Sequence, residues 1–95
     1  MIKSFKNKET EKLFQRQIIL KWKNIAELAR NKLEMIDAAT RLEQLYAVPG
    51  NRLRKLEGKQ KDYYRIWIDK QYRIIFYWGS DHHAYEVEIS KHYEN

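Results

Sequence analysis

An arginine inside an apolar stretch is the first residue with the means to do chemistry. The segment QYRIIFYW, residues 71–78, is typical of a buried β-strand, because large apolar side chains alternate along one side of it. These side chains are Tyr72, Ile74, Phe76 and Trp78. Arg73 lies between them, on the opposite side. Two interpretations stay open: an ion pair across the sheet, which contributes about 0.2–1 kcal/mol, or a phosphate clamp, since the guanidinium fork fits phosphate oxygens.

A basic segment, NRLRKLEGKQK at residues 51–61, is the second candidate. Its single acid is Glu57. Leu53 and Leu56 are expected to anchor the segment to the rest of the protein. Its cations are Arg52, Arg54, Lys55, Lys59 and Lys61. One interpretation is a solvated loop. The other is a row of cations that binds the phosphates of a nucleic-acid backbone beside an aromatic sheet. Single-stranded nucleic acid prefers this combination of cations and aromatic side chains.

Histidines supply the remaining titratable candidates. His82 and His83 are adjacent and have no Cys or His partner at ligand spacing, so we expect no zinc site. His92 falls, by strand alternation, on the same face as Arg73, and it can exchange protons near neutral pH. The chain has no cysteine, no glycine-rich phosphate loop and no other enzyme motif. We therefore expect no metal or other cofactor.

Helices are predicted in the first half of the chain. Asn7 can cap a helix that buries Leu13, Phe14 and Ile18. Residues 21–46 predict one longer helix, with Asn24 as its cap and Pro49 and Gly50 after its end. Its buried stripe would comprise Ile25, Leu28, Ala29, Lys32, Ile36, Ala39 and Leu42. A short strand at residues 2–5 would precede both helices.

The second half predicts a three-stranded antiparallel meander. Residues opposite each other in a sheet must share a face. Pairing Ile66 with Ile74, and Ile74 with Val87, makes one face wholly apolar, and the helices should cover it. The same register places Phe76 opposite Tyr85. It places Arg73 on the uncovered face, opposite Trp67 and Glu88. The other members of this face are Tyr63, Arg65, Ile75, Tyr77, Glu86, Ser90 and His92.

Composition sets the class of protein. The 95 residues predict one α+β domain over residues 1–95, with 43% hydrophobic and 34% charged residues, as in globular proteins. The net charge is +6, which favours an anionic partner such as nucleic acid or the ribosome. The start of the chain is charged and lacks an apolar run. We therefore expect a cytoplasmic protein without membrane contact.

Beyond these patterns, the chain resembles a known family over nearly its whole length. The string NRLRKLEGKQKDYYRIWIDKQYRIIFYW, followed by AYEVEIS, resembles the HigB-like toxins of the RelE/ParE superfamily. The opening MIKSFK and the helical IDAAT are also similar to that family. The resemblance implies a RelE-like fold, in which a short N-terminal strand and two helices pack on one face of a small antiparallel sheet. It also implies the toxin of a bacterial type II toxin–antitoxin system.

Such toxins are metal-independent endoribonucleases that cut messenger RNA on the translating ribosome. The resemblance implies that Arg73 contacts the scissile phosphate, and that Arg54 stands in a loop position where some relatives have histidine. Many relatives end in Asp-Tyr-His, whereas this chain has Lys91, His92 and Tyr93. His92 and Tyr93 would then transfer protons or stack on bases. RNA would be held by Arg52, Lys55, Lys59, Lys61, Arg65, Trp67 and Lys91.

The implied partner is a cognate HigA-like antitoxin with a helix-turn-helix. The toxin would be brought to operator DNA only by this antitoxin. Three alternatives stay open. The ParE branch shares the fold and poisons DNA gyrase. The changed C-terminus is compatible with an inactive domain that only binds an antitoxin. A plain RNA-binding domain would bind with strong salt dependence and would not cleave.

Overall fold

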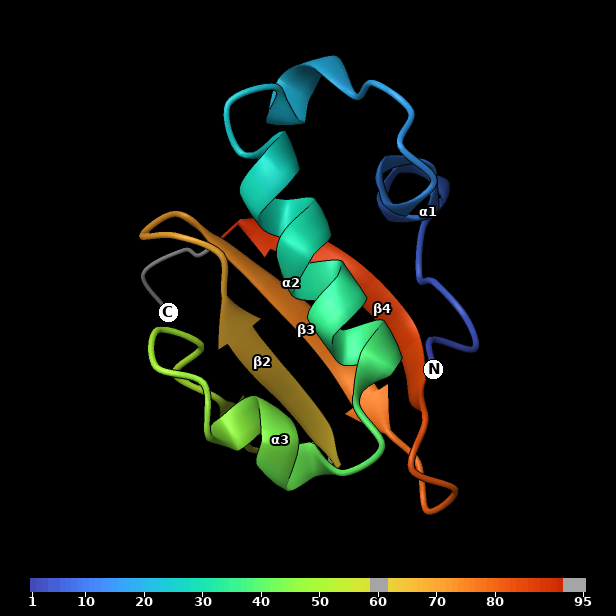
Figure 1. Cartoon of the computed structure of the whole chain (residues 1–95), viewed down its shortest axis with the longest axis vertical. Coiled ribbons are helices and arrows are strands. Elements are labelled where there is room, and N and C mark those ends of the chain that lie inside the picture. The colour runs from blue at the N-terminus through green and yellow to red at the C-terminus, as the bar shows by residue number, and fades with distance from the viewer. Residues whose placement is uncertain (59–61, 92–95) are drawn as a thin grey trace.

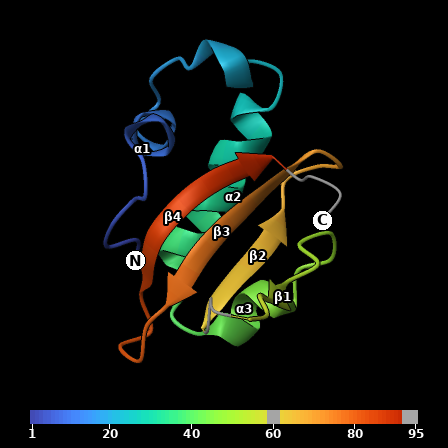
Figure 2. The same ribbon diagram turned by 180° about the vertical axis from the view of Figure 1, so that it is seen from behind.

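The chain folds as one antiparallel sheet whose strands follow in sequence order, β1-β2-β3-β4. The computed structural model describes residues 1–58 and 62–91. Figure 1 shows the longest helix lying across the front of the sheet, and Figure 2 shows the strands from behind, on the face that this helix does not cover. The helices are α1 (Lys8–Phe14), the 3₁₀ helix η1 (Leu20–Trp22), α2 (Ala26–Ala38) and α3 (Leu42–Tyr46). The strands are β1 (Arg54–Lys55), β2 (Tyr63–Trp67), β3 (Tyr72–Trp78) and β4 (Ala84–Lys91).

The core lies between α2 and the covered face of the sheet. Its fully buried members include Ala29, Leu33 and Ile36 from α2, at the three-and-four spacing of a helical stripe. Ile74 and Phe76 oppose them from β3. The predicted α+β class, with helices packed on one face of a small antiparallel sheet, is confirmed. The sheet has a fourth strand, β1, which the sequence pattern did not reveal because it is only two residues long.

The expected N-terminal strand is present only as two isolated positions. Ile2 and Phe5 form parallel bridges with Ala84 and Val87 of β4. The next element begins as predicted: the side-chain oxygen of Asn7 accepts the Thr10 N–H at 2.9 Å and caps α1. The expectation that Ile18 belongs to the buried face of this helix is wrong. It follows the end of α1 and is 83% exposed.

The single helix predicted over residues 21–46 is wrong, because the chain breaks it twice. α2 begins after Ile25, and no side-chain cap is made there, so Asn24 is not the cap. α2 ends where Ala39 takes extended backbone angles (ψ 134°) while its side chain stays buried. The Gln44 side chain then accepts the Thr40 N–H at 2.8 Å, which stabilises the start of α3. Leu28, predicted in the stripe, is 44% exposed.

The register of β2 and β3 agrees with the prediction: Ile66 lies opposite Ile74, and Trp67 opposite Arg73. The predicted register of β3 and β4 is wrong. Ile74 lies opposite Ile89, and Tyr77 rather than Phe76 lies opposite Tyr85. The shift places Ser90 opposite Arg73.

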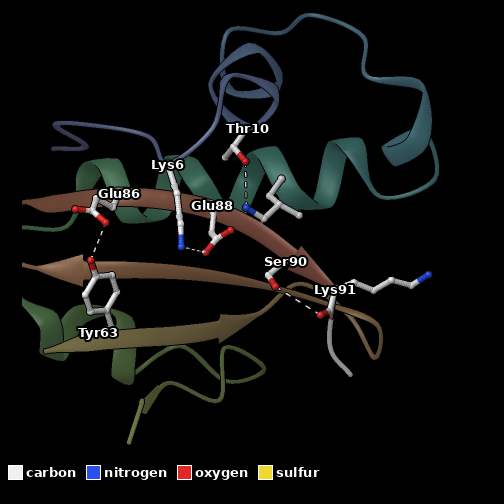
Figure 3. A network of polar contacts seen from close by, with 8 residues as sticks. Lys6, Thr10, Tyr63, Glu86, Glu88, Ser90 and Lys91 are labelled. Carbon is white, nitrogen blue, oxygen red and sulfur yellow. Dashed lines mark hydrogen bonds and ion pairs between the residues drawn. The ribbon is translucent and has the colours of Figure 1, made fainter. Parts of the chain in front are cut away.

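The shift has two sources: five residues, 79–83, rather than the predicted four join β3 to β4, and a β-bulge in β4 adds one more residue. Glu86 has a φ of 53°, in the left-handed region, and it is one residue more than the facing strand supplies. Its N–H donates to the Ser4 hydroxyl at 2.9 Å, so the irregular backbone is satisfied from the N-terminal segment. Figure 3 shows the consequence for Glu88: its carboxylate pairs with Lys6 at 3.4 Å. The predicted ion pair between Arg73 and Glu88 is therefore absent.

Candidate nucleic-acid interface

A cleft of about 490 Å³ lies beside β2 and the segment that joins α3 to β1. We call it the arginine cleft. Its lining residues are Tyr46, Arg52, Leu53, Arg54, Arg65, Trp67 and Arg73. Figure 2 shows α3, β1 and β2 together at this side of the sheet. Four of the seven lining residues are arginines and none is acidic, so the cleft is suited to an anion.

Arg73 is fixed at the inner end of the cleft and is only 4% exposed. Its Nη1 donates to three backbone carbonyls of the β2–β3 turn: Asp69 at 2.6 Å, Tyr72 at 3.1 Å and Lys70 at 3.2 Å. Its Nε is buried and has no acceptor among the described residues. A buried donor without a partner is costly, so a ligand oxygen that reaches it would be bound strongly.

The charge of Arg73 is not neutralised within the described part of the chain, where no carboxylate lies within ion-pair distance. Burial lowers the pKa of its guanidinium, and the positive charges of Arg65 and Arg52 lower it further, whereas the negative charge of Asp69 acts in the opposite direction. Burial and the two arginines thus act against its positive charge. An anion in the cleft would offset these effects, because it restores a favourable partner for the cation.

Trp67 lies between two arginines. The Cζ of Arg52 lies 3.9 Å from the ring centroid, and the Cζ of Arg73 lies 4.0 Å from it. Two guanidiniums cannot both lie over one face at that distance, so they occupy opposite faces. Contacts of this kind contribute about 0.5–2 kcal/mol each. Trp67 therefore holds both cations in place and has neither face free.

Arg54 and Arg65 lie directly opposite each other where β1 pairs with β2. Like charges at such positions destabilise a sheet. Neither side chain forms an ion pair with a described residue. Two unpaired cations on the wall of a cleft are the arrangement expected where successive phosphates bind.

Asn51 supports the cleft from beneath. It is fully buried, and its backbone carbonyl accepts the Trp67 N–H at 2.7 Å. Its side-chain Oδ1 accepts from Lys32 Nζ at 2.5 Å, and its Nδ2 donates to the Leu45 carbonyl at 3.0 Å. One residue thus joins α2 and α3 through its side chain and β2 through its backbone carbonyl. Burial also lowers the pKa of Lys32.

Five predicted site residues meet in the arginine cleft: Arg52, Arg54, Arg65, Trp67 and Arg73. Lys55 does not, because its register partner is Tyr64 on the helix side, where it pairs with Asp62 at 3.8 Å. Lys91 lies opposite Tyr72, also on the helix side, in a separate hollow with Lys21 and Trp22. Lys59, Lys61, His92 and Tyr93 lie outside the described residues.

Two residues of this region were not found by sequence reasoning. Tyr46 lines the cleft, although the sequence pattern placed it at the end of a long helix. Asn51 was one polar residue in a basic segment, and no sequence signal distinguishes its buried hydrogen bonds from those of a solvated loop. Both are brought to the cleft by the turn between α3 and β1.

The rest of the uncovered face carries a row of tyrosines. The Tyr77 ring lies 5.5 Å from Tyr63 and 6.1 Å from Tyr85, between centroids. The Tyr63 hydroxyl donates to Glu86 at 2.7 Å, as Figure 3 shows, and this hydrogen bond raises the Tyr63 pKa.

Figure 3 also shows how α1 is joined to β4: the Thr10 hydroxyl accepts the Ile89 N–H at 3.1 Å.

Within residues 1–58 and 62–91, no three side chains of His, Cys, Asp or Glu come together as a metal site would require. The helices described there are too short or too polar to cross a membrane.

Comparison with known proteins places this geometry in a family. A toxin named HigB-1 from Vibrio cholerae is 49% identical over 47 residues, which are 50% of each chain. An uncharacterised protein of Haemophilus influenzae is 38% identical over 53 residues, 56% of this chain and 52% of that one. The matched part thus spans about half the length of each curated relative.

A solved structure extends the likeness to the whole fold. The YoeB-YefM complex from Staphylococcus aureus contains a chain that superposes with a TM-score of 0.60, over 98% of this chain and 99% of that one. At 15% identity the likeness concerns the fold alone. The sequence profile of the family described as "RelE-like toxin of type II toxin-antitoxin system HigB" matches residues 3–92. The chain therefore belongs to the HigB family of RelE-like toxins from type II toxin–antitoxin systems.

Proposed function

We propose that this protein is a toxin that inhibits translation by cutting messenger RNA on the ribosome. The observation that carries the proposal is the arginine cleft, where four guanidiniums gather without an acid and the buried Nε of Arg73 has no acceptor among the described residues. Membership of the HigB family supports the same conclusion.

The reaction needs orientation and charge stabilisation more than an activated water. The RNA 2′-oxygen forms a bond with the adjacent phosphorus, and the bond from phosphorus to the 5′-oxygen breaks. A base takes the 2′-proton, and an acid gives a proton to the departing 5′-oxygen. Arg73 donates hydrogen bonds to the non-bridging oxygens as negative charge grows on them, which is the largest kind of catalytic contribution.

The other cations hold the strand. Arg52, Arg54 and Arg65 contact phosphates beside the cut, and Trp67 keeps the guanidiniums of Arg52 and Arg73 in place. Lys55, Lys59, Lys61 and Lys91 make outer contacts with messenger or ribosomal RNA. We assign proton transfer to His92 and Tyr93, on the family resemblance alone. Arg54 serves as a cation that holds a phosphate through its guanidinium fork.

We also propose a cognate antitoxin, HigA-like and bearing a helix-turn-helix, as the partner that neutralises the protein. The solved relative is a YoeB-YefM complex, which fits such a pairing. The toxin would reach operator DNA only through that antitoxin.

The test is primer extension on a messenger in a purified translation system. Arg73→Lys keeps the charge but loses the planar fork, and we expect ribosome-dependent cuts to become about 10²–10³-fold slower, as when one donor to a developing oxyanion is removed. Arg16→Gln is the matched control, because Arg16 is an exposed arginine that pairs with Glu34 away from the cleft. Circular dichroism must show that both variants fold.

Two results would contradict the proposal. Arg73→Lys could cut as fast as the wild type, or the wild type could cut nothing while translation proceeds. If induced cells then stop replication first, the ParE-like action on gyrase is the better assignment. If they grow normally, the protein only binds its antitoxin.

A further inference from the structure

The inference concerns how the arginine cleft holds a base, and it rests on the proposed function. Proteins that bind single-stranded nucleic acid combine cations for the phosphates with an aromatic face on which a base stacks. The cleft has the cations. It has two aromatic lining residues, Trp67 and Tyr46, and they differ in whether a ring face is free.

Trp67 does not offer a face, because Arg52 and Arg73 cover both of its sides. Arg73 is also held by three carbonyls of the β2–β3 turn. A base that stacked on Trp67 would have to displace one guanidinium, and the cleft would lose a fixed cation. Trp67 is therefore a positioning residue for the arginines.

Tyr46 differs from Trp67 in this respect, because its ring is not covered by the arginines. Its side chain is 73% exposed, and in the described part of the chain it has no ring partner and no hydrogen bond. The backbone beneath it is fixed, since Leu45 is 1% exposed and its carbonyl accepts from the buried Asn51. Tyr46 is thus an exposed aromatic ring on an ordered support, beside four guanidiniums.

We propose that Tyr46 is the stacking face for one of the two nucleotides that flank the cut, while Arg54, Arg65 and Arg73 hold the phosphates. The residue contributes through the π-face of its ring, so the hydroxyl is dispensable. Every base has a π-face, and purines have the larger one. Tyr46 therefore binds any base and favours a purine at its position.

The test uses ribosomes programmed with a messenger that cannot be cut. A 2′-deoxyribose replaces the attacking nucleotide, and 2-aminopurine stands in turn on each side of the cut that primer extension has mapped. Stacking on Tyr46 quenches 2-aminopurine fluorescence at one of the two positions. Tyr46→Phe keeps the quenching, whereas Tyr46→Ala abolishes it and raises the dissociation constant roughly 5- to 150-fold.

Salt dependence separates stacking from a general loss of structure. Tyr46→Ala removes no phosphate contact, so the slope of log K against log salt stays at the wild-type value. Arg65→Gln reduces that slope by about 0.7, the value for one phosphate contact on a single strand, and keeps the quenching. Leu20→Ala is the control for loss of an exposed apolar side chain, since Leu20 is 80% exposed and lies outside the cleft.

Three outcomes overturn the assignment. Tyr46→Ala can retain both quenching and affinity. It can change the salt slope, which would mean a disturbed cleft. It can cut messenger at the wild-type rate but fail to bind the antitoxin, which would make Tyr46 a protein contact. A wild type that cuts no RNA is a different failure, since it removes the proposed function itself.

Discussion

Replacing Asn51 by alanine should destabilise the protein strongly, although the residue lies outside the helices and strands. The side chain is fully buried and satisfies two groups that have no other described side-chain partner, the Lys32 ammonium at 2.5 Å and the Leu45 carbonyl at 3.0 Å. A hydrogen bond to a charged group contributes about 1.5–3 kcal/mol, and a neutral one about 1 kcal/mol. We therefore expect a loss of about 3 kcal/mol in the free energy of unfolding.

That loss is large for a small domain, whose whole stability is about 5–15 kcal/mol. Urea denaturation followed by circular dichroism measures it. With a slope of about 1–1.5 kcal/mol per molar urea, the midpoint should fall by about 2–3 M. Asn24→Ala is the matched control: Asn24 is exposed and caps no helix, so its change should stay within about 0.5 kcal/mol.

A double-mutant cycle isolates the buried pair. Lys32→Met removes the charge that Asn51 satisfies, so Asn51→Ala should cost less in that background, by at least about 1 kcal/mol. The reasoning is refuted if Asn51→Ala loses less than 1 kcal/mol, or if its effect is the same with Lys32 and with methionine. Either result would mean that water, rather than Asn51, satisfies the ammonium.

Two further predictions concern charge. Arg65→Gln removes the like charge opposite Arg54; the variant should gain about 0.2–1 kcal/mol of stability in urea while binding RNA more weakly, and a loss of stability would contradict the like-charge argument. Burial lowers the folded-state pKa of Lys32 below the usual 10.5, so the unfolded state binds more protons between the two values and stability rises with pH there. The wild type should thus gain stability relative to Lys32→Met as pH rises towards 10.5; a difference that is constant with pH would contradict it.

The sequence by itself determined the parts of the fold in which one local pattern allows one solution. The strands of the meander and the pairing of Ile66 with Ile74 follow from alternation, because a shift by one residue would move every apolar side chain to the uncovered face. The same alternation places Arg73 beside Trp67 on that face. The cap at Asn7 is also local, since it needs only a side-chain oxygen before a helical turn.

The tertiary structure decided where an irregular backbone is preferred over a regular one. Helical spacing continues through Ala39, yet the chain turns there, and the next helix buries Leu45, whose carbonyl accepts from Asn51. The bulge at Glu86 depends on Ser4, which is 82 residues away in sequence. No pattern within β4 records that contact. This bulge and the five-residue loop before β4 together place Glu88 opposite Ile75 instead of Arg73, so the predicted pairing was wrong.

The arginine cleft likewise depends on both the sequence and the tertiary structure. Arg52, Arg54, Arg65, Trp67 and Arg73 were candidates from residue type alone, and the structure brings them together. Lys55 and Lys91 were equally good candidates by charge, but the register turns them to the helix side. Charge can be read from the sequence, because it belongs to a residue. The face of the sheet on which a charged side chain lies cannot be read from the residue, because it depends on which strands pair and where a bulge shifts them.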